Sequence, residues 1–261
     1  MLTLEAQLKS ASHRRFQFLA PYQPHFGEAI IKQLIDIYLV SGHITVFFGQ
    51  HTEAFKKDIL HTSLCGHLSS QKLNDGLTSW STYTGTLKKL DWIGSSSELK
   101  FLKFENSCLL NIIDLCTGKA LKTNEREILD TILIKLARLP SDAPAAKSIT
   151  NSLELNASDV TYRTGSRSPF KQSYATSVAL TIVFDNKKMA TLQVSFKTDD
   201  VIGLDILTNP TLKALDEVYN SRLLISTFNE HRYNAKRPQI LKKLGDKTLT
   251  ELLHITDLLQ T

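Results

Sequence analysis

The sequence contains few glycines, few prolines and few cysteines. Eleven glycines and seven prolines among 261 residues argue against a fold built mainly from loops. The three cysteines, Cys65, Cys108 and Cys116, are too few for a disulfide framework and fit a reducing compartment. Charged residues occupy the N-terminus, where a secretory signal needs an apolar core, and apolar runs end before about 18 residues. We therefore expect a cytoplasmic protein without a membrane span.

The motifs of several enzyme classes are also missing. There is no Gly-x-Ser-x-Gly nucleophile elbow, no P-loop Gly-Lys-Ser/Thr and no glycine fingerprint for a dinucleotide. The spacing of His51, His61, Cys65 and His67 is not typical of a tetrahedral zinc site. The sequence therefore predicts a non-enzymatic protein with no catalytic residues, no metal site and no cofactor.

One set of carboxylates resembles a metal-dependent nuclease site but is incomplete. Such a site needs an acid, then a second acid two residues before a lysine on an adjacent strand. Asp185 supplies the first acid, but the position two residues before Lys197 is Ser195. The other acids nearby are Asp199, Asp200 and Asp205. A nuclease is therefore kept only as a distant alternative.

The chain does contain enough apolar sequence for a core and a small excess of positive charge. Hydrophobic residues make up 42% and charged residues 22% of the sequence, which is typical of globular proteins and not of disordered chains. The formal net charge of +5 permits an anionic partner but does not require one.

Residues 178–196 have the most regular pattern in the chain. Two alternating runs indicate half-buried strands, with the apolar residues Val178, Leu180, Ile182, Phe184, Ala190, Leu192, Val194 and Phe196. If both runs face one side, the numbers of paired residues must sum to an even number, because successive side chains alternate between faces. This parity excludes a two-residue loop and favours a three-residue loop at 186–188.

The remaining elements are predicted mainly from helical spacing of apolar residues. Helices are expected over 27–40, 52–73, 77–93, 124–138, 210–227 and 247–259, and strands over 43–48, near Val160 and over 201–207. Residues 95–116 are ambiguous. Ser95 and Glu98 have the spacing of a capping box, whereas Leu99 and Phe101 also suit a strand, and we favour the helix.

These elements predict an α+β fold. Residues 139–147 contain two prolines in five residues and are the best linker candidate. We expect a mainly helical part over 1–139 and an antiparallel sheet with flanking helices over 148–261. The linker is short, so the two parts can still pack as a single unit.

Two basic segments are candidate contacts for nucleic acid. Helices 52–73 and 77–93 could form a helix-turn-helix, whose second helix would expose Ser81, Thr82, Gly85, Lys88 and Lys89. The tract after Glu230 has six lysines or arginines against one acid, Asp246, and Tyr233 is available to stack on a base. Its cations are Arg232, Lys236, Arg237, Lys242, Lys243 and Lys247.

A third basic segment, 162–171, contains no acid and could cradle a phosphate. It carries Arg163, Arg167 and Lys171, and Gly165 allows close approach of the backbone. Non-enzymatic binding of DNA or RNA through these three segments is the function that the sequence favours. The alternative is a subunit or adaptor of a multiprotein assembly, in which the same cations are an ordinary solvated surface.

Overall fold

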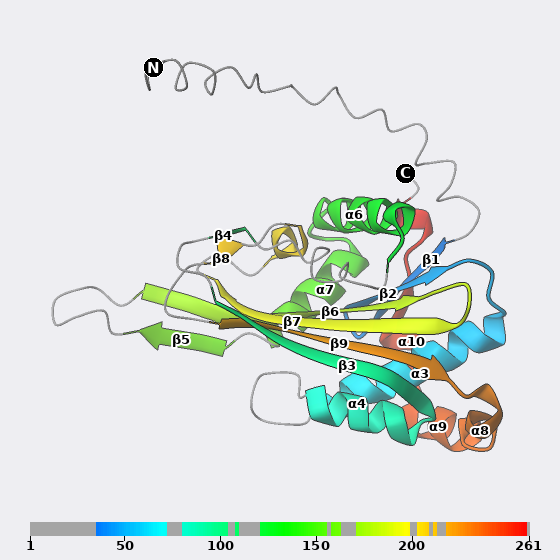
Figure 1. Cartoon of the computed structure of the whole chain (residues 1–261). Helices are drawn as coiled ribbons and strands as arrows, with labels where there is room; N and C mark the ends of the chain where they lie inside the picture. Colours follow the sequence, from blue (N-terminus) through cyan, green and yellow to red (C-terminus); the bar gives the residue numbers. More distant parts are fainter. Residues whose placement is uncertain are drawn as a thin grey trace, which may run out of the picture.

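The computed structural model describes residues 35–71, 80–103, 108–109, 121–155, 158–162, 171–198, 203–208, 211–212 and 218–259. Its strands form one mixed sheet that lies between helices on both faces (Figure 1). The predicted α+β class is therefore confirmed. The predicted segregation, with helices first and the sheet afterwards, is wrong, because three strands precede residue 104.

Seven strands make up the main part of the sheet, in the spatial order β10-β1-β2-β6-β7-β9-β3. Their bounds are β1 Ile35–Val40, β2 His43–Phe48, β3 Trp92–Lys103, β6 Lys171–Val183, β7 Lys188–Thr198, β9 Val218–Phe228 and β10 Leu252–His254. Three shorter strands extend it, namely β4 Cys108–Leu109, β5 Ser158–Tyr162 and β8 Thr211–Leu212. The pairing of β2 with β6 is parallel, and the other described pairings are antiparallel.

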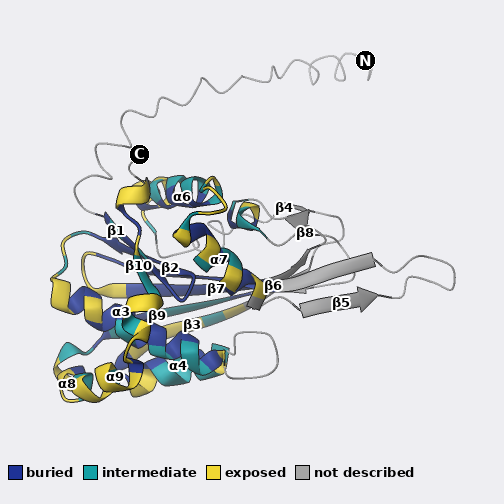
Figure 2. Ribbon diagram, turned by 180° about the vertical axis from the view of Figure 1, so that it is seen from behind, coloured by how far each residue is buried: buried dark blue, intermediate teal, exposed yellow. Residues whose placement is uncertain are grey.

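Helices cover both faces of this sheet, and each face has its own apolar core. One face carries α6 Thr123–Ala137, α7 Pro144–Leu155 and the 3₁₀ helix η1 Leu204–Leu207. The other carries α3 Glu53–Ser70, α4 Trp80–Lys89, α8 Glu230–Asn234 and α9 Arg237–Leu244. The short elements α10 Lys247–Thr250 and η2 Asp257–Leu259 flank β10. Figure 2 shows the buried residues concentrated between these layers.

The predicted hairpin is β6–β7, and its parity is confirmed. Val178 pairs with Val194 and Ile182 with Ala190, so the paired numbers have an even sum. The turn itself comprises residues 185–187, one residue earlier than predicted, because Phe184 N–H already donates to the Lys188 carbonyl at 2.8 Å. Lys187 takes the left-handed conformation, with φ of 61°, which closes a three-residue loop.

The apolar residues of the hairpin are buried on one face, as predicted, and they form a core with α6 and α7. Val178, Leu180, Ile182, Phe184, Ala190, Leu192 and Val194 are all buried there, whereas the side chain of Phe196 lies outside the described residues. The strands are not half-buried, however. Thr181, Thr191 and Gln193 on the opposite face are also buried, because α3 and α4 cover that face.

Several predicted helices are strands in the structure. Residues 35–40 of the predicted helix 27–40 form β1, residues 218–227 of the predicted helix 210–227 belong to β9, and the favoured helix 95–116 begins as β3. The helix predicted over 77–93 ends at Lys89, and the one over 247–259 ends at Thr250. The strand predicted over 201–207 contains η1 instead. Pairing with other strands overrides local helical spacing, with the adjacent strand β2 at β1 and with strands far away in sequence at β3 and β9.

The sheet includes strands from both sides of the predicted linker at 139–147. β2 pairs with β6, and helix α7 begins within the linker at Pro144. That the two parts, 1–139 and 148–261, fold independently stays a prediction.

Candidate functional site

The chain makes a sharp turn where α4 ends and β3 begins, and this turn organises a cluster of charges. Asp91 sits at the turn with φ of 68°, a left-handed conformation that is uncommon for residues other than glycine. Its side chain is only 4% exposed and contacts Arg232 Nε at 3.3 Å and Lys236 Nζ at 2.7 Å. These two cations compensate for the burial of the Asp91 side chain.

The same contacts bring the two predicted basic segments together. Lys236 Nζ also donates to the carbonyl oxygen of Lys89 at 2.8 Å, across 147 positions of sequence. Asn229 positions α8, because its side chain accepts from Arg232 N–H at 3.1 Å and its own N–H donates to the Asp91 carbonyl at 3.0 Å. We call the surface made by Lys88, Lys89, Arg232 and Lys236 the basic rim.

A cavity of about 630 Å³ opens beside the basic rim. It lies between α4 on one side and β3 with β9 on the other. Its polar end includes Lys88, Asp91 and Arg232. Its apolar wall is made by Trp80, Leu87, Trp92, Ile93 and Leu224. The arrangement suits a ligand that carries negative charge next to an apolar group.

The predicted contact residues have different positions in the structure. Lys88, Lys89, Arg232, Lys242 and Lys243 are exposed, and Lys236 is half-buried at the basic rim. Arg163 and Arg167 lie outside the described residues, as does the side chain of Lys171.

Arg237 is held in an ion pair within the protein. Its guanidinium binds both carboxylate oxygens of Asp58, with Nε to Oδ1 at 2.8 Å, and Asp58 is buried in α3. Hydrogen bonding to Asp58 raises the pKa of Arg237. Arg237 also lies 5.8 Å from the ring centre of the buried Tyr233, so this tyrosine is not available to stack on a base. These two residues anchor α8 and α9 to α3.

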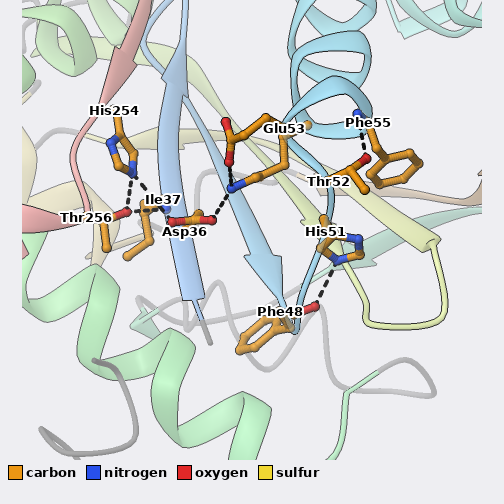
Figure 3. Close-up of polar contacts among 10 residues, drawn as sticks. Asp36, Ile37, Phe48, His51, Thr52, Glu53, Phe55, His254 and Thr256 are labelled. Atoms are coloured by element: carbon orange, nitrogen blue, oxygen red, sulfur yellow. Dashed lines mark hydrogen bonds and ion pairs between the residues drawn. The ribbon is translucent and has the colours of Figure 1, made fainter. Parts of the chain in front are cut away.

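A second polar cluster lies at the β1 edge of the sheet (Figure 3). The buried Lys56 of α3 forms ion pairs with Asp36 of β1 and with Glu53. Burial alone would lower the pKa of Lys56, but hydrogen bonds to both carboxylates raise it. On the other side, His254 Nε2 lies 2.9 Å from Thr256 Oγ1 and 3.6 Å from Asp36 Oδ1. The cluster fastens β10 and α3 to β1.

The histidines and Cys65 do not form a metal site in the described part of the chain, where no group of three or more potential ligands comes together. His67 stacks on His43 instead, with ring centres 3.9 Å apart. Burial raises the pKa of the Cys65 thiol to about 11, so the thiol stays protonated and unreactive near neutral pH.

The proposed nuclease carboxylates are only partly described. Asp185 is exposed in the hairpin turn and Asp205 is exposed in η1. Asp199, Asp200 and the side chain of Lys197 lie outside the described residues. No described helix is long and apolar enough to cross a lipid bilayer.

Sequence reasoning missed Asp91 and the cavity. The acid stands two residues after Lys88–Lys89 and directly before Trp92, which gives a local hint of an ion pair. The partner cations follow 140 or more residues later, and their return to Asp91 depends on the whole of β9. No local sequence pattern predicts the contact of Asp91 with Arg232 and Lys236.

No protein-family model and no curated protein matches the chain. Three solved structures are similar to it. The activated Cyt2Ba monomer from Bacillus thuringiensis subsp. israelensis has 11% identity and a TM-score of 0.35, over 71% of this chain and 97% of that chain. A delta-endotoxin has 13% identity and a TM-score of 0.30, over 70% and 80%. The Evf virulence factor has 8% identity and a TM-score of 0.31, over 85% and 89%. Likenesses this weak carry no argument about function.

Proposed function

We propose that the protein is a non-enzymatic nucleic-acid-binding protein and that the basic rim is its contact surface. The observation that supports this proposal is the hydrogen bond from Lys236 to the Lys89 carbonyl, which joins two basic segments far apart in sequence. Arg232 and Lys236 share the Asp91 carboxylate, so the rim keeps an excess of positive charge. Clustered cations on one surface are what phosphate backbones require.

The neighbouring helix α9 extends the cationic surface. Its last turn carries the exposed Lys242 and Lys243. The half-buried acid on α8, Glu230, is paired with Lys187 at 2.7 Å, which limits its repulsion of an approaching phosphate. A helix-turn-helix made by α3 and α4 is one mode of contact with duplex DNA, with Lys88 and Lys89 facing the groove.

The test is the salt dependence of binding. Wild-type protein should bind a fluorescent oligonucleotide at about 50 mM salt and lose most of its affinity by about 200 mM. The double variant K88E/K89E should bind at least about tenfold more weakly, and its salt slope should fall by about 2. K147E is the matched control, because Lys147 is exposed on α7 at the opposite face of the sheet. Absence of binding by the wild type at low salt would refute the proposal.

The same mixtures of protein and fluorescent oligonucleotide also test whether the protein is a nuclease. After addition of magnesium or manganese, the oligonucleotide should remain intact if the protein only binds. Divalent-dependent cleavage that is lost in Asp185→Asn would instead support a nuclease.

A second candidate is the subunit or adaptor of a protein assembly, and one observation favours it. Among the described strands, β3 pairs only with β9, and Ile93 and Leu99 on it are 51% and 52% exposed. An open strand edge can accept an extended segment of a partner. A complex that persists at about 1 M salt and is lost in Leu99→Lys would favour the adaptor over nucleic-acid binding.

A further inference from the structure

The cavity beside the basic rim has a wall that phosphate binding alone does not need. Leu87 and Trp92 are buried along it, and Ile93 remains 51% exposed at its edge. The exposed part of the Ile93 side chain is apolar surface that a ligand in the cavity could cover. The cavity therefore suits an anionic ligand that also brings an apolar surface.

Both tryptophans of the chain, Trp80 and Trp92, line this cavity. The Trp92 ring is fixed, because its Nε1 donates to Thr62 Oγ1 at 2.9 Å. Trp80 begins α4 and is half-buried, and its ring lies 6.1 Å from that of Tyr83 with an interplanar angle of 28°. Trp92 is only 3% exposed, so the half-buried ring of Trp80 is the aromatic surface on which a flat ligand would stack.

Glycine leaves this space open. Gly85 of α4 lines the cavity, and a Cβ atom added there would meet no atom within 4 Å. Glycine in a helix interior costs about 1 kcal/mol relative to alanine, so α4 is less stable here than its length allows. A larger residue at 85 would reduce the volume available to a ligand without changing any charge.

We propose that the cavity takes an unpaired base of a single-stranded nucleic acid, with the adjacent phosphates on the basic rim. This inference rests on the function proposed above and specifies its substrate class. A duplex presents its phosphates but keeps its base faces stacked, whereas a single strand presents both. Only the single strand matches cations and aromatic rings at one site.

The reporter is the tryptophan emission of the full-length protein, because both tryptophans line the cavity. Oligothymidine of about 20 nucleotides should quench this emission and bind about tenfold more tightly than a duplex of the same length, which is the effect of one stacked base. Duplex bound at the rim should leave the emission unchanged.

The decisive variant is Gly85→Leu, which occupies part of the cavity and keeps the basic rim. It should bind oligothymidine and duplex equally, with the wild-type salt slope. Gly85→Ala is the matched control and should retain the preference for the single strand. Trp80→Leu is a second variant and should also lose the preference, which keeps the test valid if Gly85→Leu does not fold.

The outcomes separate the two proposals. Equal binding of single strand and duplex by the wild type, with unchanged emission, would overturn the base-binding inference and leave the proposed function intact. Failure of both oligonucleotides to bind at low salt would overturn the proposed function itself.

Discussion

At the scale of single residues, the most consequential pair is the stacked histidines. His43 of β2 and His67 of α3 are both buried, with ring planes 22° apart. His43 Nε2 lies 3.3 Å from Ser152 Oγ of α7. Burial lowers the pKa of His43 to about 4, and burial together with the charge of His43 lowers that of His67 well below its usual value. Both rings are therefore neutral in the folded protein near neutral pH.

This pair predicts acid sensitivity. The unfolded chain takes up protons near pH 6.5 and the folded protein does not, so the free energy of unfolding should decrease as pH falls from about 6.5 to 4. His43 alone contributes about 3 kcal/mol to this decrease. Urea titrations at several pH values measure it.

The matched variants are His43→Gln and His231→Gln, the latter at an exposed position. His43→Gln should flatten the pH dependence between pH 6.5 and 4, and His231→Gln should leave it unchanged. If the free energy of unfolding of wild type and of His43→Gln changed equally with pH, His43 would not be the source of the acid sensitivity.

At the scale of elements, the sequence predicted correctly those helices and strands whose own residues have a regular apolar pattern. The hairpin β6–β7 was predicted with its parity because apolar residues alternate strictly through both strands. β3 was mistaken for a helix because Ser95 and Glu98 imitate a cap, whereas Ser95 Oγ in fact donates to the Ile225 carbonyl of β9 at 3.1 Å. That hydrogen bond needs a partner strand 130 residues away, which no local window contains.

For the candidate site, local sequence predicted several of the residues but not the contacts between them. Lys88 and Lys89 were predicted as exposed cations from the helical spacing around them, and Arg232 was predicted from the excess of positive charge in its tract. Their convergence at Asp91 was not, because it depends on how β9 returns the chain to the end of α4. Arg237 was misjudged as a free cation, since its acid, Asp58, lies 179 positions away.

The packing of α3 on α4 predicts opposite effects for two helical glycines. A Cβ atom at Gly66 would lie 2.8 Å from two ring atoms of the buried Tyr83, so Gly66→Ala should lower the melting temperature by overpacking. Gly85 has open space around it, so Gly85→Ala should raise the free energy of unfolding by about 1 kcal/mol. Thermal melts of the two variants measure the contrast, and an equal shift in both would contradict the packing.

At the scale of the whole molecule, one sheet ties the two predicted parts together. Val46 of β2 pairs with Ile182 of β6, and Ile182 is 1% exposed in the core beneath α6 and α7. Both tryptophans lie in the first part, so their emission reports on a region distant in sequence from the hairpin.

Ile182→Asp should therefore unfold the whole protein in one step. An unpaired buried carboxylate costs several kcal/mol, roughly the stability of a domain. Circular dichroism and tryptophan emission should both indicate an unfolded chain at room temperature. The control is Asn186→Asp, in the exposed turn where the side-chain oxygen can still accept from Lys188 N–H. Native tryptophan emission in Ile182→Asp would show that the first part folds alone.

The parallel pairing of β2 with β6 also has a consequence for the order of events during synthesis. β2 is complete at Phe48, but its partner residues 180–183 are made more than 130 residues later. Strand β1 must wait still longer for the C-terminal segment, since Ile37 N–H donates to Thr256 Oγ1 across 219 positions. Contacts of such separation slow folding. A nascent chain on the ribosome would thus hold β1 and β2 with an open edge until nearly all of the described sequence had emerged, and unpaired strand edges of this kind are prone to aggregate before their partner strands arrive.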